Sequence, residues 1–145
     1  MKKNLLMVMS ILLTSLILIS CGKKETYTDV KSFINDMISN QETYIESVKK
    51  AANTDEFIMT VNTFVEKHTQ LAARTQELKK KYPDIDKWDE NPPVELKDDF
   101  KRLDAAGEKM EKVMADPTVQ KFLSNAKVRK SLITLAEQME KAKFF

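Results

Sequence analysis

The chain has 145 residues with 24 basic and 22 acidic side chains, a near balance that argues against a dedicated nucleic-acid-binding protein. It contains two glycines and one cysteine, and no phosphate-binding glycine loop is present. Ala, Glu, Lys, Leu and Met are abundant and no strand-like alternation stands out, so we expect an all-α protein without nucleic-acid partners.

The first 20 residues have the organisation of a secretory signal. Lys2 and Lys3 precede a 15-residue, mostly apolar stretch that ends at Ile19, shorter than the roughly 20 residues of a membrane-spanning helix. Ordinary signal peptidase requires a small residue three positions before the cut, where Leu18 is too large. The sequence Leu18-Ile19-Ser20-Cys21 instead resembles the lipobox of bacterial lipoproteins.

This resemblance implies that the Cys21 thiol carries a diacylglyceryl group with palmitate-like chains, and that the chain is cut just before it. Two or three acyl chains hold a protein stably on a membrane, whereas one does not. Residues 1–20 would then be removed, 21–27 would form a lipid-anchored tether, and 28–145 would be a single helical domain. Gly22, and not Asp, follows the cysteine, which in Gram-negative lipoproteins favours the outer membrane.

Two long amphipathic helices are expected in the first half of the domain. Apolar residues recur every three or four positions over residues 28–52 and again over 57–82. Asn53 and Glu56 have the spacing of a capping box at the start of the second helix. Pro83 marks its end.

The second half of the domain is predicted to contain a loop and two further helical segments. The loop is residues 83–93, and a third apolar stripe covers residues 96–114. Asp116 and Pro117 have the pattern of an N-cap and first helical residue. The apolar phase slips near Asn125, which indicates that the last helix is kinked or split there.

Four helical segments of similar length with short connections predict an antiparallel up-down-up-down four-helix bundle. A five-helix arrangement with the last pair broken is the alternative. In the bundle, Trp88, Phe144 and Phe145 would lie at the end that carries the anchor. Trp88 then either contacts the membrane or, as we prefer, packs across that end of the bundle.

His68 is the only histidine, and it lies on the buried stripe of the second helix. Gln41 and Thr75 interrupt the apolar stripes, and we expect His68 to be a core histidine that is hydrogen-bonded to one of them. The alternative is b-type haem held by His68 with Met37 or Met110, although methionines on such stripes are usually core residues. We expect no cofactor.

The acidic loop has the first, third and twelfth positions of a calcium-binding loop in Asp84, Asp86 and Glu95. Trp88 and Asp89 occupy positions where that motif needs an oxygen ligand and a glycine, so we expect an ordinary acidic loop and no metal site.

None of the sequence motifs that mark known catalytic sites is present in the sequence. The carboxylate pairs 98–99 and 108–111 fit solvated helix faces, and Gly107 fits a close approach of two helices. The sequence therefore predicts a non-catalytic, lipid-anchored envelope protein that presents a helical surface to a protein partner. The alternative is a carrier of a small ligand, haem or lipid-like, within the bundle. The sequence leaves open whether the domain faces the periplasm or the outside.

Overall fold

The computed structural model describes residues 26–141, except for the side chains of 135 and 138–141. The described helices are α2 (Thr28–Lys50), α3 (Thr54–Lys81), α4 (Lys97–Met114), α5 (Pro117–Leu123) and α6 (Ala126–Lys141). Two short 3-10 turns, η1 (Ile85–Lys87) and η2 (Val94–Leu96), lie in the connection between α3 and α4. No strand occurs in this part of the chain, and the all-α prediction is confirmed.

The start of α3 has the predicted capping box. The side chain of Asn53 accepts a hydrogen bond of 3.0 Å from the Glu56 amide. Glu56 in turn accepts one of 2.9 Å from the amide of Ala52, one residue before the cap. The first bond satisfies an amide that the first turn of a helix leaves without a partner, and the second ties the residue before the cap to the helix.

The last helical segment is split where the sequence predicts. The Asp116 carboxylate accepts a hydrogen bond of 2.8 Å from the Thr118 amide and starts α5. After Leu123 the helix ends, and Asn125 accepts one of 2.9 Å from the Lys127 amide at the start of α6. Two separate N-caps within ten positions account for the short helix between them.

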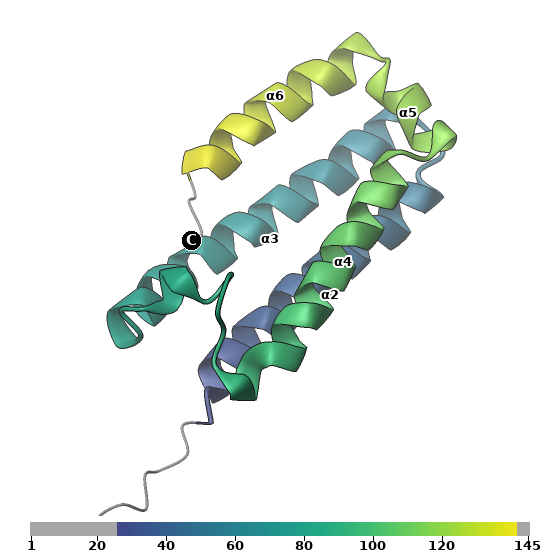
Figure 1. Cartoon of the computed structure of the whole chain (residues 1–145). Helices are drawn as coiled ribbons and strands as arrows, with labels where there is room; N and C mark the ends of the chain where they lie inside the picture. The colour runs from purple at the N-terminus through teal and green to yellow at the C-terminus, as the bar shows by residue number, and fades with distance from the viewer. Residues whose placement is uncertain (1–25, 142–145) are drawn as a thin grey trace, which may run out of the picture.

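Helices α2 and α3 form an antiparallel pair (Figure 1). Asp29, near the start of α2, lies 2.6 Å from the Lys81 ammonium at the end of α3. In the middle of the pair, the Asn40 side chain donates a hydrogen bond of 3.2 Å to the Phe64 carbonyl. The predicted antiparallel relation of these two neighbours is confirmed.

Helix α4 packs on α2 and runs in the same direction. Lys31 lies 3.9 Å from Asp99 near the start of both helices, and the Tyr44 hydroxyl lies 3.1 Å from the Met114 sulfur near their ends. The connection formed by residues 82–96 is long enough to carry the chain from the end of α3 to the start of α4, which lies beside α2.

Helix α6 packs on α3, again in the same direction. Lys127 at the start of α6 pairs with Asp55 at the start of α3, at 2.5 Å. Within the described residues, the helices with extensive contacts therefore follow the order α4–α2–α3–α6, and each helix packs on the next. The arrangement in which sequential helices are antiparallel neighbours throughout is not confirmed, because two of these three pairings join helices of the same direction.

The core consists of two clusters, one toward each end of the long helices. The cluster beside the start of α2 includes Phe33, Ile34, Ile85, Trp88 and Leu96. The cluster at the opposite end includes Tyr44, Phe57, Val113, Val119 and Val128. The prediction that Gly107 permits a close approach of two helices is wrong. Apart from the backbone of its own helix, no described atom lies within 4 Å of a Cβ placed on Gly107.

Candidate functional site

The predicted lipidation site, Cys21, lies outside the described residues and stays a prediction. Tyr27, directly before α2, is six positions further along the chain. Six residues of fully extended chain span at most about 20 Å. An anchor at Cys21 would therefore hold the α2 start within about that distance of the membrane surface.

An aromatic cluster closes this end of the domain. The Trp88 ring lies 5.5 Å from the Tyr27 ring and 5.4 Å from the Tyr82 ring, measured between centroids. Only 8% of Trp88 is exposed, so the interpretation that it packs across the end of the helices is confirmed. Contact between Trp88 and a membrane would require this packing to open. Phe144 and Phe145 lie outside the described residues.

Asp29 connects the start of α2 to the end of α3. Its carboxylate accepts hydrogen bonds from the Lys81 ammonium at 2.6 Å and the Tyr82 hydroxyl at 2.9 Å. Partial burial acts to raise the pKa of Asp29, but these bonds, with one from the Val30 amide, outweigh it and lower the pKa. The ionised carboxylate therefore stabilises the contact between the start of α2 and the end of α3.

His68 is half-buried on α3 and stacks on Phe64, with ring centroids 5.6 Å apart. Burial lowers the pKa of His68, which favours the neutral ring at pH 7. The predicted hydrogen bond is absent, because the buried Gln41 Oε1 and Thr75 Oγ1 atoms both lack a hydrogen-bond partner. Thr75 follows His68 by seven positions, which separates them by about 10 Å along the helix.

The structure identifies two buried polar groups that the sequence reasoning missed. Asn40, 5% exposed, crosslinks α2 to the α3 backbone through Phe64. Burial raises the pKa of Tyr44 to about 12, and its hydroxyl contacts the Met114 sulfur. Asn40 follows Met37 by three positions and precedes Tyr44 by four. Its place on the buried stripe could therefore be predicted from spacing alone.

The two methionines of the alternative haem site lie in different parts of the core. Met37 packs against the core cluster of Phe33 and Trp88, whereas Met110 packs against the cluster of Phe57 at the other end. The pairing of His68 with either methionine stays a prediction.

The acidic loop directs its carboxylates to lysines. Asp84 pairs with Lys87 at 2.7 Å, and Asp86 pairs with Lys79 at 2.9 Å. Within residues 26–141, no group of three or more His, Cys, Asp or Glu side chains is arranged to hold a metal ion. The spacing that resembles a calcium loop therefore does not become a cluster of ligands in these residues.

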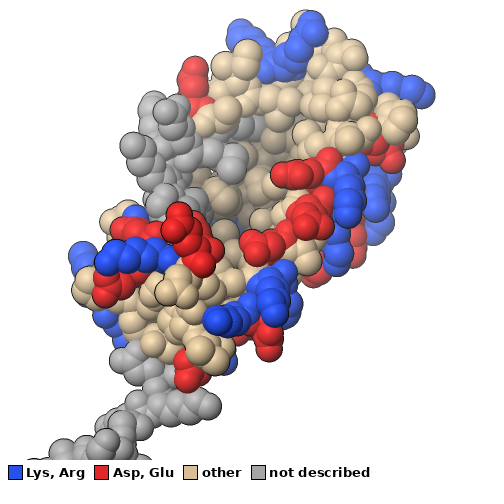
Figure 2. All heavy atoms as spheres, viewed as in Figure 1, with Lys and Arg blue, Asp and Glu red and all other residues tan. Residues whose placement is uncertain are grey.

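Charge is distributed unevenly along the domain. Residues 84–99, beside the start of α2, contain seven acidic side chains and two lysines. Residues 117–136 contain four basic side chains and no acidic one, and Figure 2 shows basic side chains gathered over the α5 and α6 end. The segment of α5 and α6 between Asp116 and Glu137 is therefore basic.

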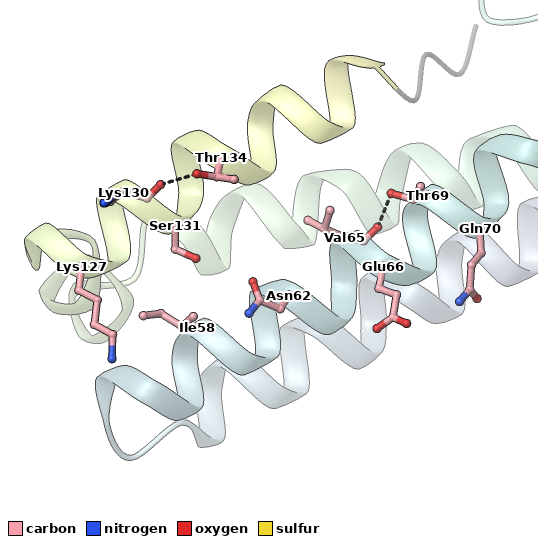
Figure 3. Close-up of a pocket in the computed structure, with 10 residues that line it drawn as sticks. All are labelled: Ile58, Asn62, Val65, Glu66, Thr69, Gln70, Lys127, Lys130, Ser131 and Thr134. Atoms are coloured by element: carbon pink, nitrogen blue, oxygen red, sulfur yellow. Dashed lines mark hydrogen bonds between the residues drawn. The ribbon is translucent and has the colours of Figure 1, made fainter.

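A groove of about 910 Å³ lies between α3 and α6 (Figure 3). Ile58, Asn62 and Val65 line it from α3, and Lys130, Ser131 and Thr134 are among the residues that line it from α6. Sequence reasoning missed the groove, because its two walls are parallel helices that were not expected to be neighbours. A second hollow, lined by residues of α2 and α3, has a volume of about 200 Å³.

Within residues 26–141, no helix is both long enough and apolar enough to cross a lipid bilayer. Comparison of the chain with protein-family models, with curated proteins and with solved structures finds no match in any of the three.

Proposed function

We propose that this protein is a non-catalytic lipoprotein of the bacterial cell envelope, anchored by acylated Cys21, that presents a helical surface to a protein partner. The observation that carries the proposal is the sequence Leu18-Ile19-Ser20-Cys21 after a 15-residue apolar stretch. Gly22 favours the outer membrane as the destination. The proposal includes one helical domain of up-down-up-down course, interrupted at α5.

The start of the described domain supports this proposal. α2 begins at Thr28, so few residues separate the predicted anchor from packed structure. The contacts of Tyr27 with Trp88, and of Asp29 with Lys81, secure the point where the tether enters. A domain held in this way presents its opposite end, with the groove and the basic side chains, away from the membrane.

The test is the fate of the Cys21→Ala variant in cells labelled with radioactive palmitate. We expect the wild-type chain to take up label, to fractionate with membranes and to begin at Cys21 by mass spectrometry. Cys21→Ala should lose the label and the cut, whereas Ser20→Ala, which keeps a lipobox, should behave as wild type. Membrane-bound, unlabelled wild-type protein that retains residues 1–20 would refute the proposal.

The accessibility of the domain on intact cells decides between the two faces. Removal of the domain by added protease indicates a surface-exposed protein, and protection indicates a periplasmic one. Either result is informative only once the presence of the protein in the membrane fraction has been shown to depend on Cys21.

A carrier of a small, lipid-like ligand is the second candidate function. The volume of the groove favours it, because about 910 Å³ is within the range of known ligand pockets. Native mass spectrometry of the purified protein distinguishes the two functions. A carrier retains a bound small molecule, whereas a protein-binding domain gives the mass of the acylated chain alone.

A further inference from the structure

We propose that the groove between α3 and α6, together with the basic side chains beside it, is the docking site for an acidic amphipathic helix of a partner protein. This inference rests on the proposed protein-binding function and names the partner's chemistry. Four features carry it: the length of the groove, its openness, the groups that line it and the charge around it.

The length and openness of the groove suit a helix. Its α3 wall runs from Ile58 to Gln70, which is 13 residues or about 20 Å of helix. Seven of the ten lining residues are exposed and only Val65 is buried, so the groove is a shallow trough along the surface. Small-ligand sites normally enclose most of the ligand, whereas grooves between helices take an amphipathic helix by its apolar face.

The lining combines aliphatic surface with polar side chains, since two of its ten residues are apolar and eight are polar or charged. Ile58 and Val65 contribute aliphatic surface. The hydroxyls of Thr69 and Thr134 donate to carbonyls of their own helices, at 2.9 Å and 3.2 Å, as the dashed lines in Figure 3 show. Because these hydroxyls already donate hydrogen bonds, an apolar face packed on both threonines does not leave them without a partner.

Asn62 and Ser131 supply the polar contacts of the groove. Figure 3 shows both side chains in the space between the helices, one from each wall. No hydrogen bond joins either side chain to another described residue, so both groups are available to a partner. A few such groups among apolar ones fix the register of a bound helix.

Charge selects an acidic partner. The groove lining holds two basic residues, Lys127 and Lys130 on α6, against one acidic residue, Glu66 on α3. Lys127 already pairs with Asp55, but Lys130 is exposed and makes no ion pair within the described residues. The surrounding residues 117–136 add Lys121 and Arg129 and no acidic side chain. Complementary charge of this kind speeds association and rejects partners of the same sign.

A second copy of the chain is a poorer occupant. The most acidic segment, residues 84–99, lies at the tether end, and the last 11 residues of α3, about 17 Å of helix, separate that end from Gln70, the nearest α3 residue of the groove. Two copies anchored in one membrane hold their grooves at the same height, so the acidic end of one does not reach the groove of the other.

The experiment uses mature, acylated protein in nanodiscs of a neutral phospholipid. The probes are fluorescent peptides of about 18 residues, long enough to form helices. The first has leucine along one face and glutamate elsewhere, the second replaces glutamate by lysine, and the third is a scrambled acidic peptide. We expect saturable anisotropy only with the acidic amphipathic probe.

Matched variants place the binding in the groove. Asn62→Trp fills it and should abolish binding, whereas Thr63→Trp, at the next exposed position of α3 and outside the groove, should leave it unchanged. Lys130→Glu should weaken binding roughly three- to tenfold, but Lys109→Glu on α4 should not. Circular dichroism verifies that each variant is folded.

Several results would overturn the inference. These are equal binding of the acidic and basic probes, binding unaffected by Asn62→Trp, and displacement of the probe by palmitate, which indicates a lipid site. Self-association of the protein that Asn62→Trp abolishes would assign the groove to a second copy. The palmitate-labelling test of Cys21 is independent of all of these, so failure of the anchor and failure of the docking site are distinguishable.

Discussion

Replacing Trp88 by alanine tests how the tether end of the domain is held together. The indole is 8% exposed and contacts both the Tyr27 and the Tyr82 rings. Truncating a buried tryptophan to alanine typically costs about 3–5 kcal/mol, to which aromatic pairs contribute about 0.5–1.5 kcal/mol each. We expect Trp88→Ala to lower the free energy of unfolding by about 3–5 kcal/mol.

For a domain of this size, that loss lowers the midpoint of thermal unfolding by roughly 10–20 °C. Circular dichroism at a helix wavelength measures it, because the variant has no tryptophan left. Val94→Ala is the matched control in the same connection, since Val94 is 77% exposed and should change stability by no more than about 0.5 kcal/mol.

The wild-type protein offers a second measurement, because Trp88 is its only tryptophan. If the indole is buried against Tyr27 and Tyr82, its emission should not change when vesicles are added to the protein. A loss of less than about 1 kcal/mol in Trp88→Ala would refute the packing argument. A blue shift of the emission on vesicles would instead return Trp88 to the role of a membrane contact.

Two further predictions concern polar groups in the same half of the domain. Thr75→Val should raise the stability to urea by up to about 1 kcal/mol, because the buried Oγ1 has no partner, while Thr69→Val, an exposed control, should change little. A loss of stability in Thr75→Val would show that the hydroxyl is satisfied. Asp29→Asn should cost less than about 1 kcal/mol at pH 7, because the Asp29 and Lys81 side chains are 37% and 60% exposed. The folded-state pKa of Asp29 lies below its ordinary value of 3.8, so its contribution is present above that pH and is lost as the pH falls through the folded pKa. Denaturation curves at pH 7 and at a pH below the folded-state pKa of Asp29 should therefore show the difference only at pH 7, and an equal difference at both would contradict the assignment.

The helix boundaries were predictable because they depend on local signals. Asn53 with Glu56, and Asp116 with Pro117, are read from residues a few positions apart, and both caps occur where expected. The break near Asn125 followed from a slip of the apolar phase, which is also a short-range signal. Such contacts form within one turn of helix and need no knowledge of the neighbours.

The neighbour relations of the helices were not predictable in this way. A short connection predicts an antiparallel neighbour, but residues 82–96 form two 3-10 turns and bury Ile85, Trp88 and Leu96 on the way. The connection is thus part of the core, and it carries the chain past α3 to the other side of α2. Which side α4 occupies depends on this packing and not on the apolar stripe of α4 itself.

The failed prediction for His68 has a similar origin. An apolar stripe reveals which face of a helix is buried, and His68, Thr75 and Gln41 do lie on such stripes. It does not reveal the height at which residues of two helices meet, or the direction of each side chain. The groove escaped prediction for the same reason, because its walls are helices whose pairing depends on the course of the whole chain. Cys21 is different, because the prediction that it is acylated depends only on the residues directly before it.

The two ends of the domain differ in how they are built, and this difference suits the proposed roles. At the tether end, α2, α3 and the connection to α4 share a core that includes the fully buried Leu96, and Asp29 adds charged contacts. At the other end, the extensive interhelical contacts of α6 within the described residues are with α3 and with the short α5. Segments with fewer packed neighbours open at lower free energy than those in a shared core. The groove is therefore bounded on one side by a helix of the central α2–α3 pair and on the other by a helix with fewer packed neighbours. A bound helix could then be accommodated without disturbing the end of the domain that is nearest the predicted anchor.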